Sequence, residues 1–439
     1  MDNETTMTTA QNNCQFNIIA ELTWRGLIHQ ITDEAALTAW LREKPRTLYI
    51  GFDPTSDSLH VGHLVALMNL RRFQQAGHRP IALVGGGTGS IGDPSGKSEE
   101  RKLLSYADIE RNIQGVKRQM QRFLRFDDSP NGALLVNNHD WLGKFSYIDF
   151  LRDVGKYFPV NVMLTKDSVR TRLESDSGLS YTEFSYMLLQ SYDFVHLNRV
   201  YDCALQLGGS DQWGNIVAGI DLARRIDSAQ LYGLTSPLLT KSDGQKMGKT
   251  AAGALWLDPN RTPPYQFFQY WINLDDADAE KTLKIFTELP QHEIADILTK
   301  HDEDRGKRLA QQRLAEAITQ LVHGDDGLGI AKRATEIFFG GEISRLNDAQ
   351  LESIFADVPS KEFPRCRLNA GLPLIDAFHE SGLAVSKADA RRTIQQGGAY
   401  INNRQRTDLD AKLGPEHLVG ESVIVVRSGK KKYALLKFV

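Results

Sequence analysis

The sequence contains few cysteines and no long hydrophobic run. Its three cysteines, Cys14, Cys203 and Cys366, are scattered and form no Cys-x-x-Cys pair. The sequence therefore predicts neither a disulfide framework nor a zinc site, and no metal-ligating residues. No apolar stretch reaches the length of a membrane span, and residues 1–13 are polar and poor in lysine and arginine, unlike a signal peptide. These absences predict a cytoplasmic protein without membrane contact.

Acidic and basic residues nearly balance in number, but they are unevenly distributed along the chain. The 439 residues carry a net charge of −3, and 41% hydrophobic and 24% charged residues are typical of a globular protein. Residues 382–439 hold eleven Lys or Arg and five Asp or Glu, a net charge of +6, which leaves −9 for the remainder. A chain of this length is expected to form two or three domains, and its basic tail predicts an RNA-binding appendage.

Residues 49–64, YIGFDPTSDSLHVGHL, predict a strand, a tight turn and a helix. The strand covers residues 47–52 and is stopped by a proline. Asp57 and Ser58 are the expected N-caps of a helix that begins at Leu59. The backbone amides and the dipole of such a helix start favour an anion.

Two histidines lie at this predicted helix start. His60 and His63 are three residues apart, so both imidazoles share one face of the first turn. Gly62 between them is expected to leave room for a ligand against the backbone. The pair suits a polyphosphate. A metal pair with Asp57 as third ligand, or plain capping histidines, are the alternative interpretations.

A glycine-rich loop, residues 85–97, follows a second buried strand. It contains the spacing Gly-x-Gly-x-x-Gly, but Asp93 and the proline after it break the helix that a dinucleotide site requires. Neither this loop nor residues 243–250 places a glycine where a phosphate-binding P-loop begins. Asp93 is instead expected to hold a substrate ammonium, unless the loop serves tight packing alone.

Three polar residues share one face of a predicted helix within a largely helical stretch, residues 141–202. Tyr186, Gln190 and Asp193 fall at positions i, i+4 and i+7. Apolar neighbours predict that this face is buried, where a phenol, an amide and a carboxylate need partners. We expect the three to bind a ligand or to form an internal hydrogen-bond network.

Further polar groups follow the strand predicted for residues 203–207. Gln206, Gly209, Asp211 and Gln212 cluster at its end. Ligands of open α/β sheets gather beyond the carboxyl ends of the strands. The cluster therefore predicts a shelf for a ribose and a substrate.

A polar loop, residues 238–250, reads LLTKSDGQKMGKT. It carries Lys246 and Lys249, and a mobile loop of this kind can close over a phosphate. Most lysine-rich loops are plain solvated surface, which is the alternative interpretation.

Together these stretches resemble the bacterial tyrosyl-tRNA synthetases, which are class I enzymes. Residues 60–63, HVGH, are similar to the family's HIGH motif, and residues 246–250, KMGKT, to its KMSKS loop. The patterns YxGFDPTxDSLHxGHL, GDPSGK, YxxxQxxD and GGSDQWGN follow the family's order, and the resemblance begins at about Phe16. Ile50 stands where relatives often carry a cysteine near the ribose, so that contact is expected to be lost or weakened. Residues 1–15 have no counterpart and are expected to be disordered.

The resemblance implies a reaction and residue roles. The carboxylate of L-tyrosine attacks the α-phosphate of ATP, which Mg²⁺ accompanies, and gives tyrosyl-adenylate and pyrophosphate; the tyrosyl group then passes to the 3′ end of tRNA(Tyr). Catalytic roles around the polyphosphate fall to Thr55, His60, His63, Lys246 and Lys249. The ATP and adenylate contacts fall to Gly51, Asp53, Gly209, Asp211 and Thr250. Tyrosine is expected to bind Tyr49, Asp93, Tyr186, Gln190, Asp193 and Gln212, with its phenol hydroxyl at Tyr49 and Asp193.

The resemblance also implies an α/β fold. A Rossmann-like parallel-sheet catalytic domain is expected over residues 16–258, with a helical insertion at about 141–202. A helical anticodon-binding domain (259–355), a linker (356–371) and a small S4-like α+β RNA-binding domain (372–439) should follow. In the last domain Lys387, Arg391 and Arg392 are expected to contact tRNA, unless they form a solvated basic face. A homodimer is carried over from the family.

Two other classes of protein share parts of this pattern. An HxGH nucleotidyltransferase would have the fold, but it would need neither the basic tail nor the YxxxQxxD stripe. A non-enzymatic RNA-binding protein would need the tail but no ATP site. The related tryptophanyl-tRNA synthetases are disfavoured because Tyr49 and Asp193 suit a phenol rather than an indole.

Overall fold

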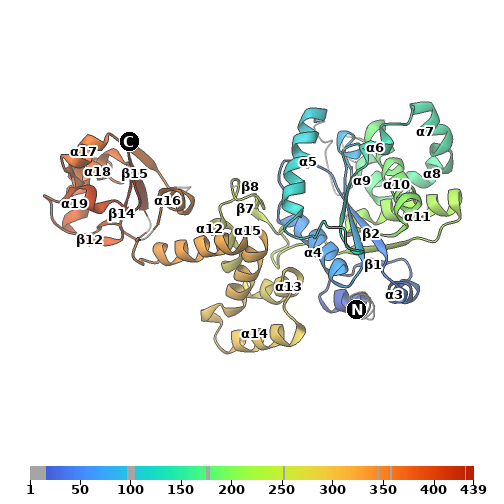
Figure 1. Cartoon of the computed structure of the whole chain (residues 1–439), viewed down its shortest axis with the longest axis horizontal. Helices are drawn as coiled ribbons and strands as arrows, with labels where there is room; N and C mark the ends of the chain where they lie inside the picture. Colours follow the sequence, from blue (N-terminus) through green and yellow to red (C-terminus); the bar gives the residue numbers. More distant parts are fainter. Residues whose placement is uncertain are drawn as a thin grey trace. The chain divides into compact units, whose positions relative to one another are not determined.

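A computed structural model describes residues 16–95, 104–174, 178–250, 253–344, 346–355, 358–430 and 432–439. The expected disorder of residues 1–15 lies outside these ranges. The chain forms two compact units (Figure 1): unit 1 comprises Met1–Asp258 and Leu274–Val322, and unit 2 comprises Pro259–Asn273 and His323–Val439. Of the helices in the described ranges, none combines the length and the apolar character that crossing a bilayer requires.

Unit 1 is built on a six-stranded sheet with the strand order β1-β6-β5-β2-β3-β4. The strands are β1 (Gln30–Ile31), β2 (Thr47–Phe52), β3 (Arg79–Val84), β4 (Leu134–Asn137), β5 (Cys203–Gly209) and β6 (Tyr232–Ser236). All neighbouring strands are parallel except β1 and β6. Successive residues of β2 and β3 are buried, which is typical of a parallel sheet covered on both faces. The predicted Rossmann-like α/β fold is confirmed.

The two central strands, β2 and β5, lie side by side although they are far apart in the sequence. Tyr49 of β2 is the register partner of Gln206 of β5. From β2 the sheet continues through β3 to β4 on one side, and from β5 to β6 on the other. The strand order therefore reverses between β2 and β5, and in open α/β sheets a crevice forms at the carboxyl ends of such a pair.

Ten helices of unit 1 precede Asp258 in the described ranges. They are α2 (Ile18–Trp24), α3 (Glu34–Glu43), α4 (Val61–Gln75), α5 (Tyr106–Met120), α6 (His139–Leu142), α7 (Tyr147–Asp153), α8 (Val160–Met163), α9 (Asp167–Leu173), α10 (Tyr181–Tyr201) and α11 (Trp213–Asp227). Local sequence sets several of their ends, because the side chains of Asn17, Asp33, Ser105 and Ser180 each accept a bond from an amide of the first turn. A buried ion pair at 2.7 Å between Arg172 and Glu183 joins α9 to α10.

Residues 274–322 pack with unit 1 rather than with the remainder of the region predicted to bind the anticodon. They form α13 (Asp276–Phe286), α14 (Gln291–Glu303) and the first part of α15 (Leu309–Phe338). Gly324, with φ of 73° and ψ of −177°, interrupts α15 near the border between the two units. Glycine adopts such a backbone at little cost, so the helix can break there.

Unit 2 contains a five-stranded sheet with the strand order β12-β11-β14-β15-β9. Its strands are β9 (Ser360–Phe363), β11 (Ala399–Ile401), β12 (Arg404–Arg406), β14 (Val423–Ser428) and β15 (Lys432–Phe438), beside a short pair of β10 (Leu372–Pro373) and β13 (Lys412–Leu413). Its helices, besides the second part of α15, are α12 (Pro264–Ile272), α16 (Asp348–Ile354), α17 (Arg365–Asn369), α18 (Leu374–Glu380) and α19 (Lys387–Gln395). Along β14, Ile424 and Val426 pack in the cluster with α18 and α19, whereas Val423 and Val425 pack in the cluster with α15 and α16. This alternation with a period of two buries both faces of the sheet.

Part of the expected linker, residues 356–371, is regular structure. Ser360–Phe363 forms β9, which runs parallel to β15 with Phe363 opposite Phe438, and α17 follows at once. The sequence did not reveal β9 because three of its four residues are exposed and polar, so no alternation is visible. Its pairing with β15, more than seventy residues later, makes it a strand. The remaining domain boundaries stay predictions.

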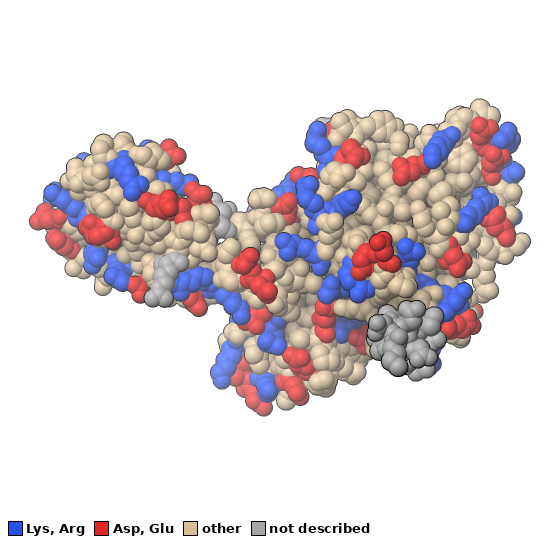
Figure 2. All heavy atoms as spheres, in the orientation of Figure 1, with Lys and Arg blue, Asp and Glu red and all other residues tan. Residues whose placement is uncertain are grey.

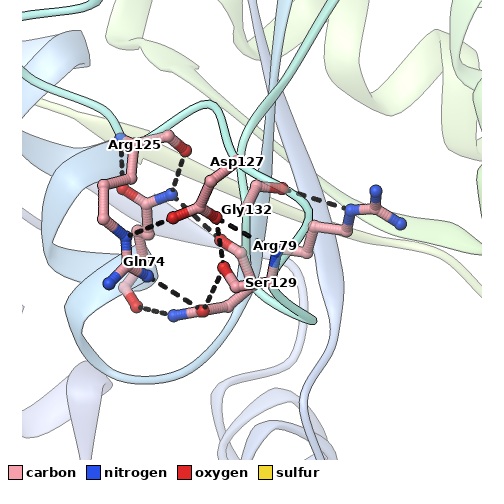
Figure 3. A network of polar contacts seen from close by, with 7 residues as sticks. Gln74, Arg79, Arg125, Asp127, Ser129 and Gly132 are labelled. Atoms are coloured by element: carbon pink, nitrogen blue, oxygen red, sulfur yellow. Dashed lines mark hydrogen bonds and ion pairs between the residues drawn. The ribbon is translucent and has the colours of Figure 1, made fainter.

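Gln74, at the end of α4, holds the loop that leads into β4 (Figure 3). Its Nε2 donates to the carbonyl oxygens of Arg125 and Asn131, both at 2.9 Å, and its Oε1 accepts from the Arg125 amide at 3.0 Å. Arg79 of β3 also donates, from Nε to the Gly132 carbonyl at 3.2 Å. One buried side chain thus pairs three backbone groups that would otherwise be unsatisfied.

Replacing Gln74 by alanine should lower the free energy of unfolding by about 2–3 kcal/mol, because buried backbone groups lose their partners. Urea titration measures this change. Gln114→Ala, at an exposed position of α5, is the matched control and should change stability by less than about 0.5 kcal/mol. An effect of Gln74→Ala no larger than that of the control would contradict the role of this network.

Candidate active site

A cavity of about 600 Å³ opens at the carboxyl ends of β2 and β5 in unit 1. The predicted residues that line it are Tyr49, Gly51, Asp53, Thr55, His60, His63, Asp93, Tyr186, Gln190, Asp193, Gly209, Asp211, Gln212, Lys246 and Lys249. Ile50 also lines it. The side chain of Thr250 lies outside the described part of the structure, and the three predicted tRNA contacts, Lys387, Arg391 and Arg392, belong to unit 2.

The helix that carries the two histidines begins later than predicted. His60 is the N-cap and α4 starts at Val61, so the prediction that Asp57 or Ser58 caps the helix was wrong. Leu59 and His60 are instead held extended by pairing with residues 255–257: the Val61 amide donates to the Leu255 carbonyl at 3.0 Å, and the Leu257 amide to the Leu59 carbonyl at 2.9 Å. A segment far along the chain therefore decides where the helix can begin.

The two histidines cap the helix reciprocally. The Gly62 amide donates to His60 Nδ1 at 3.0 Å, and the His60 amide donates to His63 Nδ1 at 3.1 Å. Because each Nδ1 accepts a bond from an N–H, the proton of each neutral imidazole is on Nε2, which makes Nε2 a donor. The ring centroids lie 4.0 Å apart, so both donors belong to one small region of the cavity.

Gly62 is required by the His60 ring. A Cβ at residue 62 would lie 2.7 Å from His60 Cε1, so the ring fills the space that we expected a ligand to use. The metal-pair interpretation gains no support: among the described residues no group of three or more His, Cys, Asp or Glu side chains is placed to hold a metal ion. Backbone amides already occupy both Nδ1 atoms.

The lysine loop is fastened to the start of α4. Its strand β7 (Lys249–Thr250) pairs with β8 (Gly253–Ala254), and the Leu255 amide donates to the Gly248 carbonyl at 2.8 Å. Gly248 has φ of +80°, and a Cβ there would lie 2.7 Å from Val61 Cβ. A glycine is therefore needed where the loop crosses the helix start. Lys246 and Lys249 are exposed to solvent and line the cavity, so both can reach a ligand there.

Asp53 is the centre of one hydrogen-bond group deeper in the cavity. The Tyr186 hydroxyl donates to its Oδ2 at 3.1 Å, and the Thr88 hydroxyl donates to its Oδ1 at 2.9 Å. Burial, followed by the Asp53 carboxyl, raises the pKa of the Tyr186 hydroxyl well above its usual range. Thr88 was missed in the sequence, because nothing local to the glycine loop connects it to Asp53.

A second group joins Asp93 to the shelf after β5. Gln212 Nε2 donates to Asp93 Oδ2 at 2.7 Å, and the Ser95 amide donates to Asp93 Oδ1 at 2.9 Å. Asn215 Nδ2 donates to Gln190 Oε1 at 3.0 Å. The structure therefore brings Asp93, Gln190 and Gln212 together as expected, through an Asn215 that the sequence did not single out.

Asp193 lies at the buried end of the site, 1% exposed. Its Oδ1 accepts from Trp141 Nε1 at 2.8 Å and its Oδ2 from Asn138 Nδ2 at 2.9 Å. Burial raises the pKa of the Asp193 carboxyl to about 8, although these two hydrogen bonds act in the opposite direction. Asn138 and Trp141 follow β4 and were not predicted. The position of Asn138 directly after a parallel strand was the one available signal.

The Tyr49 hydroxyl differs from its neighbours. Tyr49 is fully buried against Phe194, and its hydroxyl has no hydrogen-bond partner among the described residues. Tyr186, Gln190 and Asp193 have internal partners, so an internal network exists on that helix face. Since a buried hydroxyl without a partner is costly, the unsatisfied group of Tyr49 is what indicates a polar ligand beside that network.

The predicted tRNA contacts at the start of α19 differ in charge pairing. Lys387 pairs with Asp376 and Arg392 with Asp389, both at 2.7 Å, whereas Arg391 makes no ion pair or hydrogen bond with the described residues. On the visible face of unit 2, Lys and Arg side chains alternate with Asp and Glu (Figure 2). The positive charge of the tail is therefore partly neutralised locally, and of the three predicted contacts Arg391 is the exposed one whose side chain has no acidic partner among the described residues.

Comparisons with known proteins agree with this site. The family described as "tRNA synthetases class I (W and Y)" matches residues 41–340, and that described as "Tyrosine--tRNA ligase SYY-like C-terminal domain" matches residues 350–436. The tyrosine–tRNA ligase of Rhodopirellula baltica is 55% identical over 432 residues, 98% of each chain. That of Geobacillus stearothermophilus is 49% identical over 423 residues, 96% of this chain and 100% of the relative.

Solved structures show the same relationship. A C-terminally truncated mitochondrial tyrosyl-tRNA synthetase of Aspergillus nidulans has a TM-score of 0.68 and 29% identity, and the match covers 76% of this chain and 99% of that one. A tryptophanyl-tRNA synthetase of Encephalitozoon cuniculi shares the fold, with a TM-score of 0.53, 14% identity, and coverage of 76% of this chain and 90% of its own. The chain belongs to the class I tRNA synthetases of the tryptophan and tyrosine group, within the tyrosine–tRNA ligase family.

Proposed function

We propose that this chain is a tyrosine–tRNA ligase. A carboxylate oxygen of L-tyrosine attacks the α-phosphorus of ATP, the bond to the β,γ-pyrophosphate breaks, and tyrosyl-adenylate and pyrophosphate form. The tyrosyl group then passes to a hydroxyl at the 3′ end of tRNA(Tyr), and AMP leaves. The observation that carries the proposal is one cavity that holds two imidazole donors and two lysines together with a buried phenol that no described residue pairs.

The polyphosphate lies at the histidine and lysine end of the cavity in this proposal. His60 and His63 donate from Nε2, Thr55 adds a hydroxyl, and Lys246 and Lys249 supply positive charge. Such groups stabilise the charge that spreads over the phosphates without any covalent enzyme intermediate. ATP enters as its Mg²⁺ complex. Bound to the phosphates, the ion would neutralise part of their charge.

The amino acid and the adenylate occupy the deeper part. Asp93, Tyr186 and Gln190 face the tyrosine ammonium, with Gln212 beside them, and Tyr49 and Asp193 face its phenol hydroxyl. The adenylate contacts fall to Gly51, Asp53, Gly209, Asp211 and Thr250. Burial, followed by Asp93, raises the pKa of the Asp211 carboxyl, which marks it as part of the same charged group.

The chain acts as a homodimer in the cytoplasm, where ATP and tRNA are found. Support for the dimer comes from large apolar side chains exposed on α7, α8, α9 and the start of α10: Tyr147, Ile148, Val160, Val162, Leu164, Leu173 and Tyr181. Large apolar side chains left in water favour burial against a partner. The molar mass from light scattering at micromolar concentration tests the dimer, and a monomer mass would remove it.

Pyrophosphate–ATP exchange across a panel of amino acids tests the function. Exchange should depend on tyrosine and be much weaker with phenylalanine and tryptophan, since a site built to pair a substrate hydroxyl rejects analogues that lack it; tyrosine-specific synthetases are the usual example of this rule. Tyr49→Phe should reduce the tyrosine preference over phenylalanine by about threefold to tenfold, the value of one hydrogen bond. Exchange that ignores tyrosine would refute the function.

The preference for tyrosine should also depend on pH. With the pKa of Asp193 at about 8, the carboxyl is protonated below that pH and ionised above it. An ionised carboxylate accepts the phenol hydrogen bond more strongly, so the ratio of kcat/KM for tyrosine to that for phenylalanine should rise by about fivefold between pH 6.5 and 8.5. Because both amino acids share the ammonium group, the ratio isolates the hydroxyl. A rise that persists in Asp193→Asn, or a flat ratio in the natural protein, would contradict this prediction.

Transfer to tRNA should depend on Arg391. Arg391→Ala should weaken tRNA binding and reduce the dependence of log affinity on log salt concentration by about one, as for one lost phosphate contact. Arg367→Ala is the matched control, because that guanidinium is held by Glu380 at 2.8 Å. Tyrosine-dependent exchange should be unchanged in both variants. Equal salt slopes for the two would remove Arg391 from the tRNA surface.

A further inference from the structure

The buried carboxylate of Asp278 contacts the loop that carries Lys246 and Lys249. Asp278 lies in the first turn of α13 and is 3% exposed. Its Oδ1 accepts from the Ser242 amide at 2.9 Å, and its Oδ2 accepts from the Ser242 hydroxyl at 3.2 Å. Lys281, one turn along the same helix, donates to the Thr240 carbonyl at 3.2 Å. One end of α13 is thus hydrogen-bonded to two residues of the loop, Thr240 and Ser242.

Ser242 is in the turn of a tight hairpin, residues 240–246, that ends at Lys246. Thr240 pairs with Lys246 across the hairpin, and the Lys241 amide donates to the Gln245 carbonyl at 2.8 Å. A shift of Ser242 must therefore move the strand that presents Lys246. The other side of the loop is held by the start of α4, through Gly248 and Leu255. The loop is therefore hydrogen-bonded to α13 on one side and held at the start of α4 on the other.

The opposite end of α13 is anchored by arginines. Arg25 donates to the carbonyl oxygens of Lys284 and Thr287 at 2.6 and 3.0 Å, and Arg72 of α4 donates to the Ile285 carbonyl at 2.7 Å. These carbonyls are among those that a helix leaves unpaired at its C-terminus, and the positive charge favours the helix dipole there. The helix that bears the histidines therefore also fixes the far end of α13.

Burial of the Asp278 carboxylate needs a reason. A carboxylate removed from water is costly unless donors replace its hydration. In the described residues its two oxygens accept hydrogen bonds from Ser242 alone, an exposed residue of the loop. These bonds therefore hold Ser242, and with it this part of the loop, at the N-terminal end of α13.

We propose that α13 is a strut that sets the position of the lysine loop over the polyphosphate, with Asp278 as its positioning residue. Asp278 touches no reactant. It acts on Lys246 through Ser242. Because the other end of α13 is bonded to α4, the position of the loop is fixed relative to the helix that carries the histidines. The inference rests on the proposed function, because it concerns where the lysines meet ATP.

Asp278→Ala should lower kcat of tyrosine-dependent exchange by about tenfold to a hundredfold, because small displacements of a catalytic group have effects of that order. The dissociation constant of tyrosine should change by less than about twofold, since the loop does not reach the phenol end. Thr287→Val is the matched control: Thr287 is buried at the far end of the strut, bonds the Leu283 carbonyl through Oγ1, and does not touch the loop. It should leave kcat unchanged.

A double-mutant cycle with Lys246→Ala separates positioning from stability. If Asp278 acts through Lys246, the double variant should be scarcely slower than Lys246→Ala alone. Ser242→Ala, an exposed substitution that keeps the fold, should give a smaller fall of about threefold to tenfold for one lost hydrogen bond. Asp278→Asn, which can still accept and donate toward Ser242, should restore most of the rate.

Two results would overturn the inference: kcat near that of the natural protein in both Asp278→Ala and Ser242→Ala, or effects of Asp278→Ala and Lys246→Ala that multiply fully. If Asp278→Ala does not fold, the Ser242→Ala rate and its cycle with Lys246→Ala decide in the same way. Absence of tyrosine-dependent exchange in the natural protein would instead refute the proposed function, so the two failures are distinguishable.

Discussion

The site depends on a short run of backbone hydrogen bonds between residues 59–61 and 255–257. These bonds keep Leu59 and His60 extended, so α4 cannot start before Val61, and His60 becomes its cap. The helix then uses both imidazoles to satisfy its first amides, which fixes each ring and places its proton on Nε2. Leu255 also binds Gly248, so the same segment brings the lysine loop beside the histidines. Loss of this pairing would release both halves of the phosphate end at once.

The deeper pocket is organised by two carboxylates, half-buried Asp53 and buried Asp193, that receive hydrogen bonds from distant elements. Asp53 is bound by Thr88 and Tyr186, and Asp193 by Asn138 and Trp141. Such networks cost less than unpaired buried charge and hold the groups in one geometry before any ligand binds. The Tyr49 hydroxyl has no hydrogen-bond partner in the described ranges of the chain, so a polar ligand group is needed at the bottom of the cavity.

The region after Asp258 serves both units. Leu274–Val322 packs with the catalytic unit, where Arg25 and Arg72 bind the end of α13. Beyond the break at Gly324, buried residues of α15 and α16 pack with Val423, Val425 and Leu435 of the C-terminal sheet. A boundary drawn from helical periodicity alone cannot find this division, because it falls inside a run of consecutive helices, within α15.

The sequence by itself determined the strand-turn-helix that carries His60 and His63, the polar stripe of Tyr186, Gln190 and Asp193, and the polar cluster that follows the strand at residues 203–207. These features follow from periods of two and 3.6 residues and from turn chemistry, which are local properties of the chain. Only the tertiary structure decided which groups meet: Asn138 and Trp141 with Asp193, Thr88 with Asp53, β9 with β15 and Asp278 with Ser242. The physical reason is that these partners are far apart along the chain, so strand order, register and helix packing bring them together, and no local pattern records those choices.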